Sequence, residues 1–139
     1  MFRQKQRGSD LRSLELFADC TPTELAAIDA ASTRLWIDAG RVLLREGDAD
    51  QQFMVIVEGE VGVSRETGSL VAVLSAGDFI GEMGMLTGER RSATVTALSS
   101  VQLLVCNGGE FAVLGQAPSV KDKLLAAAAT RASENALAA

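Results

Sequence analysis

The strongest constraint on the fold is the pattern of short apolar runs between Arg34 and Cys106. These runs are rich in β-branched residues and follow a period of two. Turn residues interrupt them at close intervals: Gly47-Asp48, Gly59, Thr67-Gly68, Gly77-Asp78 and Ser99-Ser100. Many short strands with frequent turns predict an all-β architecture, a jelly-roll β-barrel. We therefore expect residues 34–106 to form the barrel.

Helices are predicted on both sides of the barrel, so the expected fold is mainly β with helical flanks. Residues 10–32 and residues 110–137 are the two helical regions. Residues 1–8 carry three basic side chains and few apolar ones, which predicts a mobile tail. All of these segments are expected to form one domain, residues 1–139.

The N-terminal flank contains a strong helix-start signal. Thr21 is a suitable N-cap, Pro22 occupies the first helical position, and Glu24 can close a capping box. This helix should end near Ser32, and a shorter helix over Asp10–Phe17 should precede it. The helix that begins at Pro22 is interpreted as a packing helix without chemistry.

The C-terminal flank is predicted to be a short helical turn followed by a long helix. The turn covers 110–115, and Pro118 begins an alanine-rich helix that ends near Leu137. One side of the long helix is expected to be an apolar stripe of Val120, Leu124, Leu125, Ala128 and Ala132.

The stretch Asp78–Val95, DFIGEMGMLTGERRSATV, interrupts the strand pattern with a longer glycine-bearing segment. Gly81 and Gly84 would let the backbone approach a ligand and would leave N–H groups free at the start of a short helical turn. Glu82 can accept hydrogen bonds from sugar hydroxyls, and the guanidinium of Arg91 can bind two phosphate oxygens. A carboxylate that can bind a sugar, together with a guanidinium that can bind a phosphate, indicates a nucleotide site. A strand that begins at Ala93 is expected to hold Arg91.

Composition limits the other functions. With 47% hydrophobic and 22% charged residues, the chain is typical of a globular domain, and its net charge of −5 argues against bulk nucleic-acid binding. No apolar run is long enough to span a membrane and no secretory signal is apparent, so the expected location is the cytoplasm. Cys20 and Cys106 are expected to be free and buried.

The run GDFIGEMG closely resembles that of bacterial catabolite activator proteins, and the chain is similar to the cyclic nucleotide-binding domain family. Other residues extend this resemblance from about Leu14 to the C-terminus. They are the turn glycines Gly47, Gly59 and Gly77 and the hinge-helix residues Phe111, Leu114 and Pro118. The resemblance implies that residues 78–95 are the phosphate-binding cassette of that family.

The resemblance also implies roles for the cassette residues. Glu82 would bind the ribose 2′-hydroxyl and Arg91 the cyclic phosphate, whereas Arg90 would point away on a strand. The remaining pocket residues would contribute backbone or hydroxyl groups: Gly81, Met83, Gly84, Ser92 and Ala93. Apolar residues that could line a base pocket, with core packing as the simpler assignment for each, are Val55, Val61, Val63, Val73 and Leu74.

The ligand implied by the resemblance is cAMP, with cGMP as the second choice and no cofactor or metal. Family members selective for cGMP often carry threonine after the phosphate arginine, where this chain has Ser92. The long C-terminal helix would close over the base as a lid, and Asn135 could read adenine or simply face solvent. The activator proteins continue into a helix-turn-helix, which is absent before Ala139, so direct DNA binding is not expected. A homodimer and an effector on a separate chain are the two partner hypotheses.

Two other functional classes agree less well with the sequence. A barrel that has lost its nucleotide could act as a structural or protein-interaction module, but retention of Glu82 and Arg91 argues against it. An enzyme of the cupin type is disfavoured because the chain contains no histidine. The sequence therefore predicts a non-catalytic cyclic-nucleotide receptor domain that signals through its terminal helices.

Overall fold

The structure, a computed structural model, describes residues 9–49, 51–66 and 68–138, with side chains between residues 10 and 131 of those ranges. The predicted mobile tail and the side chains of Asn135 and Ala132 lie outside what it describes.

Eight strands form two antiparallel sheets of four strands each. The first sheet has the order β1 (Thr33–Ile37), β8 (Val101–Cys106), β3 (Phe53–Glu58) and β6 (Phe79–Ile80). The second has the order β2 (Val42–Leu44), β7 (Thr94–Ala97), β4 (Glu60–Ser64) and β5 (Leu70–Ser75). The predicted jelly roll is confirmed, as two packed sheets rather than one closed barrel in the described residues.

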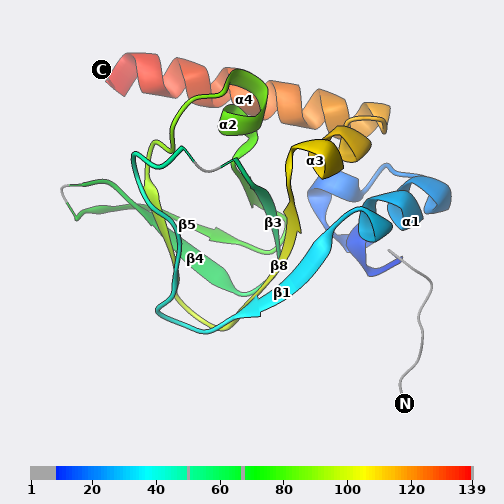
Figure 1. Cartoon of the computed structure of the whole chain (residues 1–139), viewed down its shortest axis with the longest axis horizontal. Coiled ribbons are helices and arrows are strands. Elements are labelled where there is room, and N and C mark those ends of the chain that lie inside the picture. Colours follow the sequence, from blue (N-terminus) through cyan, green and yellow to red (C-terminus); the bar gives the residue numbers. More distant parts are fainter. Residues whose placement is uncertain (1–8, 50, 67, 139) are drawn as a thin grey trace.

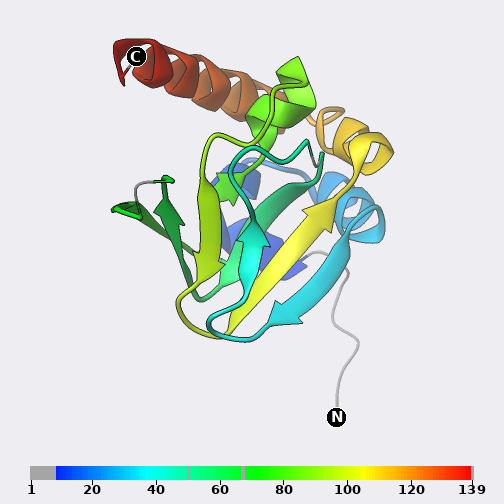
Figure 2. The ribbon, with the colours of Figure 1, turned by 60° about the vertical axis from the view of Figure 1, so that its left-hand side comes forward.

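The molecule is built in three layers, which Figures 1 and 2 show from two sides. Helices cover one face of the first sheet, and the second sheet packs against its other face. Alternate residues of β3 therefore enter two different cores: Phe53 and Val55 pack against the helices, and Met54 and Ile56 pack between the sheets. Each fully buried side chain of this size contributes about 1.5–3 kcal/mol.

The helices that precede the sheets differ in part from the prediction. The predicted helix over Asp10–Phe17 is wrong: two 3-10 helices, η1 (Ser9–Ser13) and η2 (Glu15–Phe17), replace it. Leu14 between them has an extended backbone (φ −87°, ψ 136°). This break lets four apolar side chains at uneven spacing all become buried, which one helical face could not do: Leu11, Leu14, Leu16 and Phe17.

Helix α1 (Pro22–Ala30) begins where the capping signal predicts. The Thr21 hydroxyl accepts from the Glu24 amide at 3.1 Å, and the Glu24 carboxylate accepts from the Thr21 amide at 2.9 Å. Arg34 on β1 donates to Asp10 and Asp29 and so ties this helical flank to the sheet. Cys20 and Cys106 are free and buried, as expected.

Two helices follow the last strand. α3 (Gly108–Leu114) begins two residues earlier than predicted because Asn107 is its N-cap and forms a second capping box with Glu110. α4 (Pro118–Ala138) is the long predicted helix and crosses above α2 at the open end of the two sheets (Figure 1).

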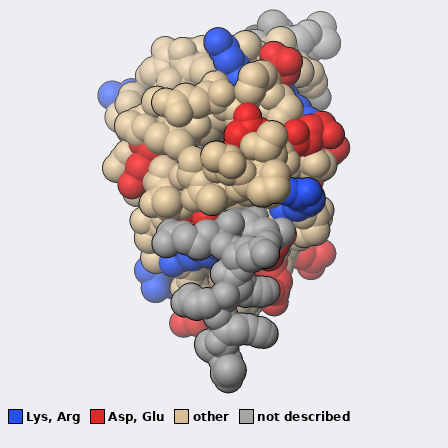
Figure 3. Space-filling model, turned by 90° about the vertical axis from the view of Figure 1, so that its right-hand side faces the viewer, with Lys and Arg blue, Asp and Glu red and all other residues tan. Residues whose placement is uncertain are grey.

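The predicted apolar stripe on α4 is correct at two of its positions and wrong at another. Val120 and Leu124 are buried, whereas Leu125 is 47% exposed and belongs to the outer side of the helix. On the face shown in Figure 3, charged side chains of both signs are interspersed and most of the surface is uncharged.

Candidate functional site

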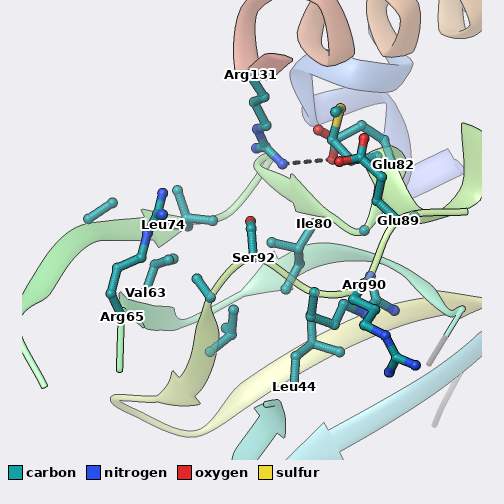
Figure 4. Close-up of a pocket in the computed structure, with 17 residues that line it drawn as sticks. Leu44, Val63, Arg65, Leu74, Ile80, Glu82, Glu89, Arg90, Ser92 and Arg131 are labelled. Carbon is teal, nitrogen blue, oxygen red and sulfur yellow. Dashed lines mark hydrogen bonds and ion pairs between the residues drawn. The ribbon is translucent and has the colours of Figure 1, made fainter. Parts of the chain in front are cut away.

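A cavity of about 360 Å³ opens between the second sheet, the short helix α2 (Glu82–Thr87) and α4 (Figure 4). Its size is within the range of small-molecule sites. The lining falls into a polar side, made by residues 81–84 and 89–93 with Arg131, and an apolar side, made by the sheet. Every cassette residue predicted as a ligand contact lies along the polar side: Gly81, Glu82, Met83, Gly84, Arg91, Ser92 and Ala93.

Gly81 is required by the backbone at the start of α2. Its φ of 99° is left-handed, and an added Cβ would clash with the carbonyl oxygen of Gln52 and lie 2.8 Å from Nη1 of Arg91. Gly84 is one turn further on, and a Cβ there would lie 3.3 Å from the carbonyl oxygen of Glu89. The two glycines therefore allow the first turn of α2 to lie close to Arg91, with N–H groups of that turn outside the helical hydrogen-bond ladder.

Arg91 is held by backbone contacts and not by a strand. The predicted strand is present as β7 and begins at Thr94, one residue later than expected, but the expectation that it carries Arg91 is wrong because Arg91 lies in the preceding loop. Its amide donates to the Asp48 carbonyl at 2.9 Å, and its carbonyl accepts from the Gly47 amide at 2.8 Å. Nη2 of Arg91 donates to the Gln52 carbonyl at 2.6 Å. Although only 7% of Arg91 is exposed, its guanidinium lines the cavity.

Arg90 differs from Arg91 in burial. Its side chain is exposed, and Nη1 donates to the Gly47 carbonyl at 3.0 Å. The expectation that Arg90 points away on a strand is wrong: Arg90 lies in the loop before β7, like Arg91, and it also lines the cavity. Of these two adjacent arginines, Arg91 is therefore the more deeply buried in the site.

Glu82 is fully buried in the first turn of α2, and one of its two carboxylate oxygens is bound by an arginine of α4. Nη1 of Arg131 donates to Oε1 of Glu82 at 2.7 Å, and Nη2 donates to the Phe79 carbonyl at 3.0 Å (Figure 4). The guanidinium also lies 5.7 Å from the centre of the Phe79 ring. Oε2 of Glu82 accepts no hydrogen bond from any residue that the structure describes. The carboxylate is thus half satisfied and has one acceptor left.

Burial raises the pKa of Glu82 above its ordinary value, and the positive charge of Arg131 only partly opposes this effect. Removal from water disfavours the charged form, whereas hydrogen bonds to the carboxylate favour it. A ligand hydroxyl that donated to Oε2 would lower this pKa toward its usual range.

Arg131 was not predicted from the sequence. It lies 49 residues after Glu82, and only the folded chain brings the two together. The available signal is that Arg131 is the one basic residue of the long helix after Lys123, in a segment of mostly alanine. Such a signal marks the residue but does not identify its partner.

The apolar side of the cavity is formed by β2, β4, β5, β6 and β7. Of the five residues predicted as possible lining of a base pocket, Val63 and Leu74 line the cavity. Val55 and Val61 are buried in the cores instead, which agrees with their simpler assignment. For Val73 both assignments are wrong: it is 50% exposed because Ala72 and Leu74, its neighbours on the strand, point to the cavity.

The cavity therefore combines an arginine next to a helix start, a buried carboxylate with one open acceptor, and an apolar wall. These groups match an anion, a hydroxyl and a flat apolar group in one ligand. Within the described ranges, no three acidic or thiol side chains gather closely enough to hold a metal ion.

Comparisons with known proteins agree with this geometry. Residues 34–117 match the family profile of the cyclic nucleotide-binding domain. The acetyltransferase Pat of Mycolicibacterium smegmatis is 33% identical over 128 residues, which cover 90% of this chain and 38% of Pat. The catabolite activator protein of Thermus thermophilus is 27% identical with a TM-score of 0.75, over 88% of this chain and 60% of that one.

A third similar protein is a cAMP-binding acyltransferase from Mycobacterium smegmatis, a mutant whose structure is 32% identical with a TM-score of 0.74. The matched region covers 92% of this chain and 41% of the acyltransferase. The chain thus spans well under half of the acyltransferase. Separately, none of the helices in the described part of the chain has the length and apolar character needed to cross a membrane.

Proposed function

Because the chain belongs to the cyclic nucleotide-binding domain family, we propose that its cavity binds a cyclic purine nucleotide, cAMP in preference to cGMP, without catalysing a reaction. The observation that carries this proposal is the open acceptor Oε2 of Glu82 beside the buried guanidinium of Arg91 in one cavity. A phosphate and a ribose hydroxyl are the two groups that this pair suits, and they are adjacent in a cyclic nucleotide.

The phosphate binds at Arg91 and at the first turn of α2. Two main-chain hydrogen bonds fix the backbone of Arg91, and the bond from Nη2 to the Gln52 carbonyl orients its guanidinium, so little side-chain freedom is lost when it binds an anion. The net charge of −5 works against anion binding over the whole surface, and the site therefore depends on these local donors.

The ribose binds at Glu82. Its 2′-hydroxyl donates to Oε2, and this bond removes the cost of a buried acceptor without a partner, about 1–3 kcal/mol. The base then lies against the apolar wall at Val63 and Leu74. Preference for cAMP is supported by Ser92 where cGMP-selective relatives often have threonine, and by the similarity to an acyltransferase that binds cAMP.

The signal passes through α4. Arg131 occupies Oε1 of Glu82 while the ribose occupies Oε2, so one carboxylate binds the helix and the ligand together. The ligand favours the docked helix, and the docked helix favours the ligand, because each lowers the cost of a buried charge. Couplings of this kind are typically about 1–3 kcal/mol. The output would reach a second copy of the chain or a separate effector.

Titration calorimetry of the full chain with cAMP, cGMP and AMP tests the proposal. We expect binding of both cyclic nucleotides, tighter for cAMP, and much weaker binding of AMP, whose phosphate carries an additional charge and is not closed into a ring with the ribose 3′-oxygen. If neither cyclic nucleotide binds at millimolar concentration, the domain is a structural or protein-interaction module and the proposal is wrong.

A further inference from the structure

Arg65 is a cavity residue that the proposed function does not use. It follows β4 at the hairpin to β5, lines the cavity, and has an exposed side chain. Within the described part of the chain, no carboxylate lies within ion-pair distance of its guanidinium and no acceptor is bound to it. All its side-chain donors are therefore available to a ligand.

The position of Arg65 in the cavity identifies the part of a ligand that it would meet. In Figure 4, Arg65 lies beside Val63 and Leu74, on the side of the cavity opposite Arg90 and Glu89. The polar side of the cavity, with Arg91 and Glu82, is assigned to phosphate and ribose. What remains for the base is the apolar wall, and Arg65 lies next to that wall.

The donors of Arg65 distinguish the two purines. Guanine presents two neighbouring acceptors, O6 and N7, and arginine binds this pair with two parallel hydrogen bonds. Adenine has an amino group at the corresponding position, which is itself a donor, beside N7. A guanidinium cannot bind two groups of which one is a donor, so Arg65 favours guanine.

We infer that Arg65 is a base-reading residue, which binds O6 and N7 of the base when the ligand is a guanine cyclic nucleotide. This inference rests on the proposed function, because it assumes that phosphate and ribose occupy the polar side. The affinity for cGMP then depends on Arg65, whereas the affinity for cAMP depends only on the apolar wall and the polar side of the cavity. Arg65 therefore narrows the preference for cAMP.

The test compares the affinities of three ligands for the full chain and for Arg65→Gln. The ligands are cAMP, cGMP and the cyclic nucleotide of inosine, which keeps O6 and N7 but lacks the 2-amino group of guanine. Loss of one bidentate contact should weaken cGMP and the inosine nucleotide by about tenfold or more. The affinity for cAMP should change by less than about twofold.

A matched control separates base reading from a general effect of charge. Arg41→Gln removes the same charge from an exposed position outside the cavity lining, and it should leave all three affinities unchanged. Melting temperatures of both variants should equal that of the wild type, since neither guanidinium forms an ion pair with a described residue.

Two outcomes would overturn the inference. If Arg65→Gln weakens all three ligands equally, Arg65 only attracts the phosphate, and if it weakens none, Arg65 does not touch the ligand. In both cases the proposed function stands, because the wild type still binds cAMP. If the wild type binds no cyclic nucleotide, both proposals fail together.

Discussion

Arg91 and Arg90 are adjacent in sequence and differ in environment, which makes them a test of the site at the scale of single residues. Arg91 is almost buried and lies in the cavity, and Arg90 is exposed at its edge. Removal of a charge that is buried against a ligand phosphate costs more than removal of one that is exposed to water.

We therefore expect Arg91→Ala to weaken cAMP binding by at least about a hundredfold, equivalent to about 3 kcal/mol. Arg90→Ala should weaken it by less than about fivefold. Calorimetry on both variants, with the melting temperature as a control for folding, measures the difference. Equal affinities for the wild type and Arg91→Ala would remove Arg91 from the site.

Glu82 makes the ligand-free protein sensitive to pH. Its folded-state pKa is raised by burial, so its contribution to stability is fully present below the pKa of an unfolded glutamate, about 4.3, and is lost as pH rises through the folded-state value. The free energy of unfolding of the wild type, relative to Glu82→Gln, should fall over the interval from about pH 4.3 up through the folded-state pKa.

The affinity for cAMP should depend on pH in the opposite direction to the stability of the ligand-free protein. A ribose hydroxyl stabilises the charged carboxylate, so cAMP affinity should rise with pH over the same interval. Denaturant titrations and calorimetry at several pH values check the two trends. A pH dependence of affinity that persists in Glu82→Gln would assign it to another group.

At the scale of elements, the short helix α2 and the long helix α4 depend on each other. α4 docks by Val120 and Leu124 in its first two turns and by Arg131 in its second half. Its middle is alanine-rich and contributes little apolar area, so the docked state of its second half rests on few contacts.

Bound cAMP should slow amide exchange across residues 121–137, because ligand and docked helix stabilise each other through Glu82. Hydrogen exchange with and without cAMP measures this, and truncation of the chain at Pro118 should lower affinity. Unchanged protection together with unchanged affinity would show that α4 is not a lid. Reduced affinity with Asn135→Ala unaffected would keep the lid and discard Asn135 as a base reader.

The ease of prediction from sequence differs among the elements for physical reasons. The start of α1 and the existence of the strands are encoded by residues that are close together in the sequence. Thr21 and Glu24 are three residues apart, and a period-two run can be recognised without knowing which strand it pairs with. The break at Leu14 was not foreseen because it depends on which core each apolar side chain enters. Strand β5 was found, but an apolar run alone does not reveal that Val73 faces outward.

In the candidate site, too, features set by residues close in sequence could be predicted and features set by distant residues could not. The cassette residues are within one stretch of sequence, so their grouping could be predicted, and their roles as ligand contacts remain a prediction. The contacts that fix them could not be predicted, because Arg131 and Gln52 are 49 and 39 residues away from their partners. Long-range pairs are set by the packing of layers and not by any local pattern.

At the scale of the whole molecule, ligand binding should appear as stability. A ligand that binds only the folded state adds about 2.7 kcal/mol at a hundredfold excess over its dissociation constant. For a chain of 139 residues this is a rise in melting temperature of about 10 °C. Thermal unfolding with cAMP, and with AMP as the control, measures it, and no rise with either cyclic nucleotide would contradict the proposed function.

The alternation along β3 has a consequence for how damage to this protein would be distributed. The side chains at odd-numbered positions, Phe53 and Val55, pack against the helices. Those at even-numbered positions, Met54 and Ile56, pack between the two sheets that form the cavity. In a saturation mutagenesis of this strand, substitutions at odd positions would loosen the helices proposed to transmit the signal, and they would lower nucleotide affinity less than substitutions at even positions. Variants that bind the nucleotide without responding to it would then carry substitutions at odd positions of β3. Variants that fail to bind it would carry them at the even positions in between.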